Sequence, residues 1–341
     1  MARLIIHAGL GKTGTTALQT WLSRAQGLAA RGILHAGIEL QGLPGRMRLP
    51  GQGAVGDPGL LARGLEKIEA AAARPEVDAI VWSNESIGMS HNRAGIAAAL
   101  DAFLAGSAHV DALEIVLVLR RQDEWIESAY RQWGLRHKMR KGYGVPTPRQ
   151  YLAGAQGLLD YRGLWRLWSR VGGAAVRVIS YDDVMAGGGM APVFAREVLG
   201  IDAADHPVPG GPADGRVHVS PGPALSYFHA LYNAGRPGPV PPEEFGALIE
   251  ACALPELAPP GAAFFGKAIR REILRRHAAD NDALAQEALG RPHLFADRPV
   301  ADVARYTEGP QHALTYFALI AARQDQRGAR AALRNAFAPP E

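Results

Sequence analysis

The chain has 341 residues, of which 48% are hydrophobic and 21% are charged. This length and composition are typical of one or two globular domains and exclude an intrinsically disordered chain. The 37 Lys and Arg residues against 33 Asp and Glu leave a formal net charge of +4, which suits anionic ligands, but no basic run is long enough to indicate a nucleic-acid partner.

The first predicted element is a short strand, Leu4 to Ala8, which leads through a short loop into a helix that begins near Thr15. Further apolar runs predict strands at residues 79–82, 115–119 and 176–179, each followed by polar residues and then by a helical pattern. Continuous apolar strands that alternate with helices are typical of a parallel sheet with both faces covered. We predict an α/β fold of three layers, with a central parallel sheet flanked by helices.

The segments between these elements also have a recognisable composition. Residues 37–59 contain seven glycines, and residues 206–223 and 234–242 are rich in Pro and Gly, so we interpret them as long loops that form lids or acceptor-binding walls. After Pro259 the pattern is helical again. Four arginines there are interpreted as a solvated helix face, namely Arg270, Arg271, Arg275 and Arg276. We predict an α/β core at residues 1–205 and a helical, loop-rich C-terminal cap of the same domain at residues 206–341.

Cys252 is the only cysteine, which excludes an intrachain disulfide and a cysteine metal cluster and fits a reducing compartment. The apolar run at the N-terminus is too short for a signal peptide, and no stretch approaches the roughly 18 apolar residues of a membrane span. We therefore expect a cytoplasmic protein without an integral membrane segment.

The loop between the first strand and the first helix, residues 9–16, reads GLGKTGTT. Glycines let backbone N–H groups turn toward a ligand, the helix N-terminus adds about half a positive charge, and the lysine adds a full one. The threonine hydroxyls can donate to further oxygens, and Thr15 or Thr16 can also cap the helix. The pattern predicts an anion-binding loop made by Gly11, Lys12, Thr13, Gly14, Thr15 and Thr16.

A nucleotide triphosphatase loop is the alternative interpretation, because Gly11, Lys12 and Thr13 match the last three places of G-x-x-x-x-G-K-[ST]. The first glycine of that pattern falls on Ile6, inside the strand, so the long phosphate-wrapping loop is missing. A small-molecule kinase that uses ATP and magnesium therefore stays as the second hypothesis.

Residues 7–19, HAGLGKTGTTALQ, resemble the 5′-phosphosulfate loop of the PAPS-dependent sulfotransferase family, which reads K-[ST]-G-[ST]-[TS] after a first strand. The bacterial branch, with its K-T-G-T-T-x-L-Q form, is the most similar. The resemblance implies a P-loop-like fold and an enzyme that uses 3′-phosphoadenosine 5′-phosphosulfate (PAPS) as the sulfuryl donor. It also implies that Lys12 contacts the bridging oxygen of the leaving phosphate, while Thr13, Gly14, Thr15 and Thr16 hold the 5′-phosphate.

Such a donor carries a 3′-phosphate, so a second anion site is expected about one nucleotide away. The family's 3′-phosphate motif is an arginine at a strand end with a serine eight residues later, and Arg120 and Ser128 have this spacing. Arginine suits phosphate because its planar fork donates two hydrogen bonds at once. Arg121 is the alternative arginine. The resemblance covers roughly residues 4–200, and beyond them the G-x-x-G-x-x-K motif of the animal enzymes has only a partial match.

Sulfuryl transfer to a hydroxyl needs a base near the attacking oxygen. Glu85 follows the second predicted strand and is expected in the same crevice as Lys12, and a glutamate at this place resembles the base of many bacterial members. The alternative is that Glu85 caps the next helix or pairs with Lys12 or an arginine. His91 and His137 are reserve candidates, and His7 is interpreted as a hydrogen-bonded core residue.

A sulfuryl group brings one negative charge fewer than a phosphoryl group, so a lysine with backbone and hydroxyl donors can suffice. We find no carboxylate pair at metal-ligand spacing, interpret Asp182 and Asp183 as a helix start, and expect no metal requirement. The sequence thus predicts a PAPS-dependent sulfotransferase whose acceptor is a small molecule or a glycan. The kinase and a catalytically silent nucleotide-binding module remain as the other hypotheses.

Overall fold

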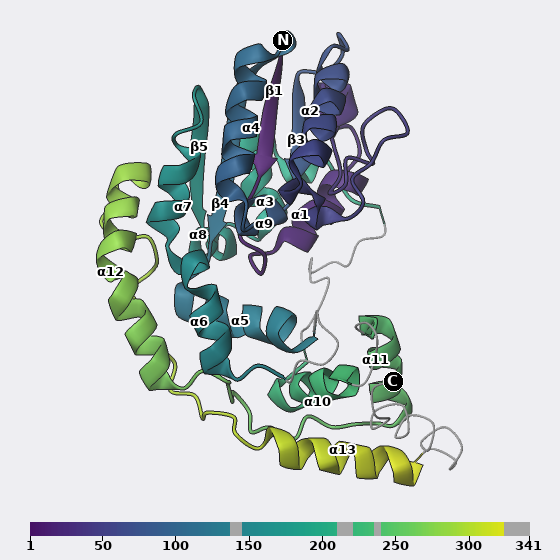
Figure 1. Ribbon diagram of the computed structural model, residues 1–341, viewed down its shortest axis with the longest axis vertical. Helices are drawn as coiled ribbons and strands as arrows, with labels where there is room; N and C mark the ends of the chain where they lie inside the picture. Colours follow the sequence, from purple (N-terminus) through teal and green to yellow (C-terminus); the bar gives the residue numbers. More distant parts are fainter. Residues whose placement is uncertain (137–144, 210–220, 235–239, 324–341) are drawn as a thin grey trace. The chain divides into compact units, whose positions relative to one another are not determined.

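The computed structural model describes residues 1–136, 145–209, 221–234 and 240–323 (Figure 1). The chain divides into two compact units, each assembled from three separate stretches. The first unit consists of Met1–Arg121, Leu158–His218 and His277–Asp297, and the second of Gln122–Gly157, Val219–Arg276 and Arg298–Glu341. The proposed assignment of residues 1–205 and 206–341 to a core and a cap stays a prediction.

A five-stranded parallel sheet forms the centre of the first unit (Figure 1). Its strands are β1 Ala2–His7, β2 Ile33–His35, β3 Ala79–Ser83, β4 Val110–Leu119 and β5 Ala174–Ser180. The order across the sheet is β2-β3-β1-β4-β5, so β1 lies in the middle, between β3 and β4. The prediction of a parallel α/β sheet is confirmed, and β2 was not among the predicted strands.

Strand β4 begins at Val110, earlier than the apolar run that predicted it. Asp111 is exposed and interrupts the hydrophobic pattern. Glu114 is buried, and its carboxylate forms ion pairs with Arg3 at 3.3 Å and with Arg177 at 2.6 Å. A carboxylate is tolerated inside the sheet because cations from both neighbouring strands neutralise it.

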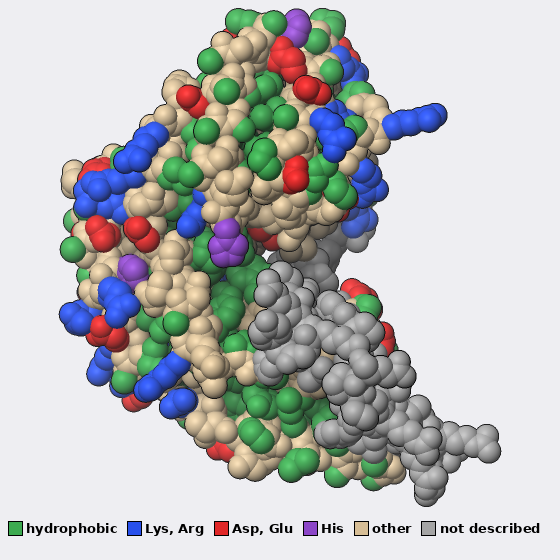
Figure 2. Space-filling model, viewed as in Figure 1, with side chains coloured by type: hydrophobic (Ala, Val, Ile, Leu, Met, Phe, Trp, Pro, Cys, Tyr) green, Lys and Arg blue, Asp and Glu red, His purple; other side chains and the backbone are tan. Residues whose placement is uncertain are grey.

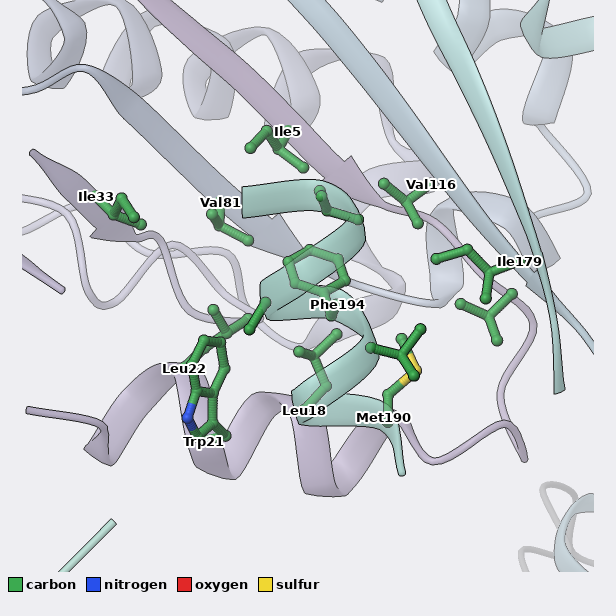
Figure 3. Packing of buried hydrophobic residues seen from close by; sticks show 14 of the residues in the cluster. Ile5, Leu18, Trp21, Leu22, Ile33, Val81, Val116, Ile179, Met190 and Phe194 are labelled. Carbon is green, nitrogen blue, oxygen red and sulfur yellow. The ribbon is translucent and has the colours of Figure 1, made fainter. Parts of the chain in front are cut away.

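Helices cover both faces of the sheet. On one face, α1 (Thr15–Arg24) and α9 (Met190–Phe194) pack together, and their apolar side chains meet those of Ile5, Val81 and Val116 in a buried cluster (Figure 3). The other face is covered by α2 (Pro58–Ala72), α4 (Arg93–Gly106) and α7 (Tyr161–Trp168). The remaining elements of this unit are short: η1 Ala29–Arg31, η2 Gln52–Gly56, α3 Ser86–Met89, α8 Tyr181–Ala186, η4 Ala195–Leu199 and η5 Ala203–Asp205.

The second unit is helical in its described part. It contains α5 Gln122–Ala129, η3 Tyr130–Arg136, α10 Pro223–Ala234, α11 Pro242–Ala251 and α13 Gly309–Arg323, most of α6 Pro148–Leu159, and the first part of α12 Lys267–Leu289. Phe228 packs against the rings of Phe245, Tyr316 and Phe317. The helix predicted after Pro259 is α12. None of the helices in the described ranges has a stretch long and apolar enough to cross a bilayer.

The interpretation of the α12 arginines as solvated is wrong for one of them. Arg270 is buried, and its guanidinium lies 3.5 Å from the carboxylate of Glu127. Glu127 also accepts hydrogen bonds from the backbone N–H groups of Phe264 and Phe265. The other three arginines are exposed, as predicted. On the face drawn in Figure 2, Lys and Arg side chains are interspersed with Asp and Glu.

Candidate active site

The predicted anion-binding loop, residues 9–16, is called the Lys12 loop below. It lies between the carboxyl end of β1 and the first turn of α1. Lys12 has a φ of +71° and Gly14 a φ of +88°, so two residues of the loop are left-handed. A left-handed backbone costs a residue with a β-carbon about 1–2 kcal/mol, and such strain is concentrated at functional sites. Left-handed residues that alternate with ordinary ones are also the backbone geometry of anion-binding nests.

The threonine hydroxyls of the loop have different surroundings. Thr13 is fully buried and donates to the carbonyl oxygen of Leu10 at 2.6 Å, so its hydroxyl stabilises the loop itself. Thr15 is also buried, but its hydroxyl finds no hydrogen-bond partner among the described residues. Thr16 is exposed. A buried polar group without a partner is unfavourable, so an anion oxygen at the loop would satisfy the Thr15 hydroxyl.

The N-terminus of α1 has no side-chain cap. Gly14 occupies the N-cap position, so the prediction that Thr15 or Thr16 caps the helix is wrong. The first turn also contains no acidic residue. Because no side chain of the first turn neutralises it, the partial positive charge of the helix N-terminus favours an anion at the loop.

Two glycines, Gly9 and Gly88, allow neighbouring segments to pack closely against the start of the Lys12 loop. The Nδ1 atom of His7 and the Oγ atom of Ser83 are 2.9 Å apart, and burial lowers the pKa of His7 to about 4. His7 is thus a neutral, hydrogen-bonded core residue, as predicted. A β-carbon on Gly9 would lie 2.9 Å from His7 Nε2, and one on Gly88 would lie 2.1 Å from the carbonyl oxygen of Ala8. Any side chain at these positions would therefore displace the loop.

Glu85 lies between β3 and α3. Its Oε2 accepts a hydrogen bond from Gln19 Nε2 at 3.4 Å, and Gln19 also donates to the carbonyl oxygen of Ser83 at 3.2 Å. Burial raises the pKa of Glu85, while its hydrogen bonds and the positive charge of Lys12 act in the opposite direction. Glu85 is thus close enough to Lys12 for their charges to interact. Its side chain does not cap α3, which removes one of its alternative roles.

Arg120 follows directly after β4. Its Nη1 lies 3.5 Å from the carbonyl oxygen of Lys12, and its guanidinium lies over the ring of Tyr181, 5.0 Å from the ring centroid. The carbonyl oxygen of Arg120 accepts a hydrogen bond from the Tyr161 hydroxyl at 2.6 Å. Arg121 is buried, whereas Arg120 is half-buried. Of the two arginines it is therefore Arg120 whose guanidinium is shown beside the Lys12 loop.

Three side chains at this edge of the sheet were not singled out in the sequence. Gln19 touches Glu85 and ends the matched segment HAGLGKTGTTALQ, so its place in that motif was an available signal. Tyr161 and Tyr181 hold Arg120 from α7 and α8. Tyr181 is the first residue after β5, which is the same position relative to a strand that drew attention to Arg120.

The other predicted residues lie elsewhere. Ser128 is half-buried in the second turn of α5, in the second unit, and its joint role with Arg120 stays a prediction. His91 is exposed between α3 and α4. His137 lies outside the described residues. Among the histidines proposed as reserve bases, none is therefore shown beside Lys12.

The carboxylates after β5 have a structural role. Asp183 lies in the first turn of α8, where its N–H donates to Ser180 Oγ at 3.1 Å, as expected for a helix start. Its carboxylate pairs with Arg291 at 2.9 Å. Within residues 1–136, 145–209, 221–234 and 240–323, no three His, Cys, Asp or Glu side chains are grouped closely enough to hold a metal ion.

A cavity of about 480 Å³ lies beside the edge strand β5, with walls from β4, α8, α9, η4 and α12. None of the predicted site residues lines it. Its carboxylates are already neutralised, since Glu114 pairs with Arg177 and Glu197 pairs with Arg196. We therefore place the chemistry at the Lys12 loop and not in this cavity.

The comparisons with known proteins add no family. A scan of the chain against protein-family models gives no match, and a search of the curated proteins gives no matching relative.

Proposed function

We propose that this protein is a sulfotransferase that transfers a sulfuryl group from PAPS to a hydroxyl or amine of a small-molecule or glycan acceptor. One observation carries the proposal: the Lys12 loop, the Arg120 guanidinium and the Glu85 carboxyl lie at the carboxyl ends of three adjacent strands, β1, β4 and β3. Ligands of open parallel sheets bind at this edge. Two cations and a helix N-terminus suit a donor with two phosphate groups and a sulfate, and a carboxyl with a raised pKa suits proton abstraction.

The donor would be held at two points. Its 5′-phosphosulfate lies on the loop, where its oxygens meet Lys12, the N-terminus of α1 and the Thr15 hydroxyl, whose hydrogen bond is otherwise unmade among the described residues. Its 3′-phosphate lies on Arg120, whose two-pronged guanidinium can donate two parallel hydrogen bonds to one phosphate. The contact between Arg120 and the Lys12 carbonyl supports this arrangement, because it places the Arg120 guanidinium beside the backbone of the loop that carries Lys12.

The transfer proceeds in line. Glu85 takes the proton from the acceptor hydroxyl or amine as the acceptor atom forms a bond to sulfur. The bond between sulfur and the 5′-phosphate oxygen breaks on the opposite side, and its electron pair stays on that oxygen. Lys12 stabilises the negative charge that develops there, and 3′-phosphoadenosine 5′-phosphate (PAP) leaves. Glu85 then gives its proton to solvent.

Binding measurements with PAP, AMP and ATP plus magnesium test the proposal. We expect PAP to raise the Tm without added metal and to bind more tightly than AMP, which lacks the 3′-phosphate. Lys12→Ala and Arg120→Ala are expected to weaken PAP binding. Arg196→Ala is the matched control, because it removes an exposed arginine of the same unit. Stabilisation by ATP with magnesium but not by PAP would support the kinase instead.

A further inference from the structure

The glycine-rich loop, defined here as residues 37–56, is folded around a buried lysine of α2. The Nζ atom of Lys67 donates hydrogen bonds to the carbonyl oxygens of Leu40 at 2.8 Å, Gly45 at 3.3 Å and Met47. An ammonium group has three donors, and this one uses all of them on the loop. Burial lowers the pKa of Lys67, as expected for an ammonium taken out of water.

The three carbonyls belong to one turn of the chain and converge on one point. Leu40 and Gly45 have φ values of +61° and +92°, so the turn depends on left-handed residues. Carbonyl oxygens that converge inside a turn repel one another unless a donor lies between them. The Lys67 ammonium is such a donor, and it joins three carbonyls of the glycine-rich loop to α2.

The glycine-rich loop is also attached to the turn that carries Glu85. Asn84, the residue before Glu85, donates through Nδ2 to the carbonyl oxygens of Ile38 at 3.2 Å and Gln52 at 3.1 Å. Beyond α3, Asn92 donates to the carbonyl oxygen of Gly56 at 3.1 Å. The loop thus binds both ends of the segment 84–92, and a change in its fold would be transmitted to Glu85.

The order of the strands places this loop on a defined side of the site. Arg120 follows β4, on one side of β1, whereas Glu85 and the glycine-rich loop follow β3 and β2, on the other side. The proposed donor cations therefore lie at β1 and β4. The loop borders the side of Glu85 that is away from Arg120, where the acceptor would have to approach.

We propose that Lys67 is a positioning residue, which holds the glycine-rich loop as the acceptor-side wall of the site and thereby keeps Glu85 in place and partly shielded from water. The identification of this side with the acceptor depends on the proposed sulfotransferase function. The attachment of the glycine-rich loop to α2 and to the segment 84–92, called the clamp below, depends only on the contacts of Lys67, Asn84 and Asn92.

The clamp is tested by carboxyl labelling with a carbodiimide and glycine ethyl ester, read by mass spectrometry, together with hydrogen exchange. In Lys67→Met we expect labelling of Glu85 to rise severalfold and exchange to accelerate in residues 37–56 and 84–92. Labelling of the buried Glu114 should not change. Lys267→Met, which removes a lysine paired with Asp302 in the second unit, should behave like the wild type. Lys67→Arg, which keeps the charge and the donors, should restore most of the protection.

Several results would overturn the proposal. One is unchanged labelling of Glu85 in Lys67→Met. Another is an equal rise in the labelling of Glu85 and Glu114, which would indicate that the whole unit opens. If Lys67→Met does not fold, Lys67→Gln gives the same measurement, because it removes the charge but keeps an amide donor. The affinity for PAP should change less than about twofold in Lys67→Met, and a large loss would place the loop on the donor side. A wild-type protein that binds no PAP would contradict the proposed function but leave the labelling result valid.

Discussion

The Nη1 atom of Arg120 lies 3.5 Å from the carbonyl oxygen of Lys12, although the two residues are 108 positions apart in the sequence. Both cations therefore belong to one edge of one sheet. The donor proposed here needs this arrangement, because its two phosphate groups are carried by the same ribose.

Lys12 is expected to serve turnover at the expense of stability. Lys12→Ala should lower the rate of sulfuryl transfer about 100- to 1,000-fold, as the loss of a single charge-stabilising donor does in other enzymes. Lys12→Gly should be equally inactive but more stable than Lys12→Ala, by about 1 kcal/mol, because glycine tolerates the φ of +71°. Urea unfolding of the two variants measures the difference, and equal stabilities would show that the left-handed backbone is not strained.

Arg120→Ala is expected to weaken PAP binding by about 1.5–3 kcal/mol, the range for hydrogen bonds to charged groups, which corresponds to roughly 10- to 150-fold. AMP binding should change much less, because AMP lacks the 3′-phosphate that is proposed to contact Arg120. Isothermal titration with both ligands gives the comparison. An equal loss for PAP and AMP would assign Arg120 to the 5′-phosphate instead.

Glu85 is expected to control the pH dependence of the rate. A base acts only when ionised, so kcat/KM should rise with pH through the raised pKa of Glu85 and level off above it. Glu85→Gln should abolish this limb and most of the activity, while PAP affinity is retained. A pH–rate profile measured with radiolabelled PAPS checks both, and an unchanged profile in the variant would exclude Glu85 as the base.

The same carboxyl should affect stability, and in the opposite direction to a paired carboxylate. Because burial raises its folded-state pKa, Glu85 contributes most to stability when protonated, and that contribution is lost as the pH rises through the folded pKa. Glu85→Gln should therefore be more stable than the wild type at pH 8. The advantage should disappear below the ordinary glutamate pKa of 4.5. Denaturant unfolding at the two pH values is the measurement.

Gly88→Ala is expected to displace the Lys12 loop, because Gly88 packs against the backbone of Ala8 just before that loop. Its β-carbon would lie 2.1 Å from the carbonyl oxygen of Ala8, so α3 must move away from β1, at a cost of about 1–3 kcal/mol. Gly246→Ala is the control, because it is a helical glycine with open space around the new carbon. Unfolding curves and PAP titrations should show losses for the first variant alone.

The sequence was sufficient for the parts of the site that follow directly from local pattern. The apolar runs at β1, β3, β4 and β5 predicted strands, and a parallel sheet brings the residues after each strand to one edge, so the amino-acid sequence alone groups Lys12, Glu85 and Arg120. The Lys12 loop was recognisable because its glycines, lysine and hydroxyls are contiguous.

What the sequence missed depends on contacts between distant segments. The first half of β4 was overlooked because Glu114 reads as a surface residue, and only Arg3 and Arg177 make its burial possible. Arg270 was placed on the surface for the same reason, since its partner Glu127 lies on another helix. The hydroxyl directions were also not predictable, because nothing in the motif distinguishes Thr13, which donates to the carbonyl oxygen of Leu10, from Thr15, whose hydroxyl has no partner among the described residues.

The central position of β1 also has a consequence for biosynthesis. The strand forms its hydrogen bonds with β3 and β4, so its pairing on both edges cannot be complete until Val116 has left the ribosome. Contacts of such long sequence separation form late and slow the folding of a domain. Nascent or truncated chains that end before β4 would therefore display an apolar strand with an unsatisfied edge, and chaperone capture or aggregation is the expected fate of such fragments.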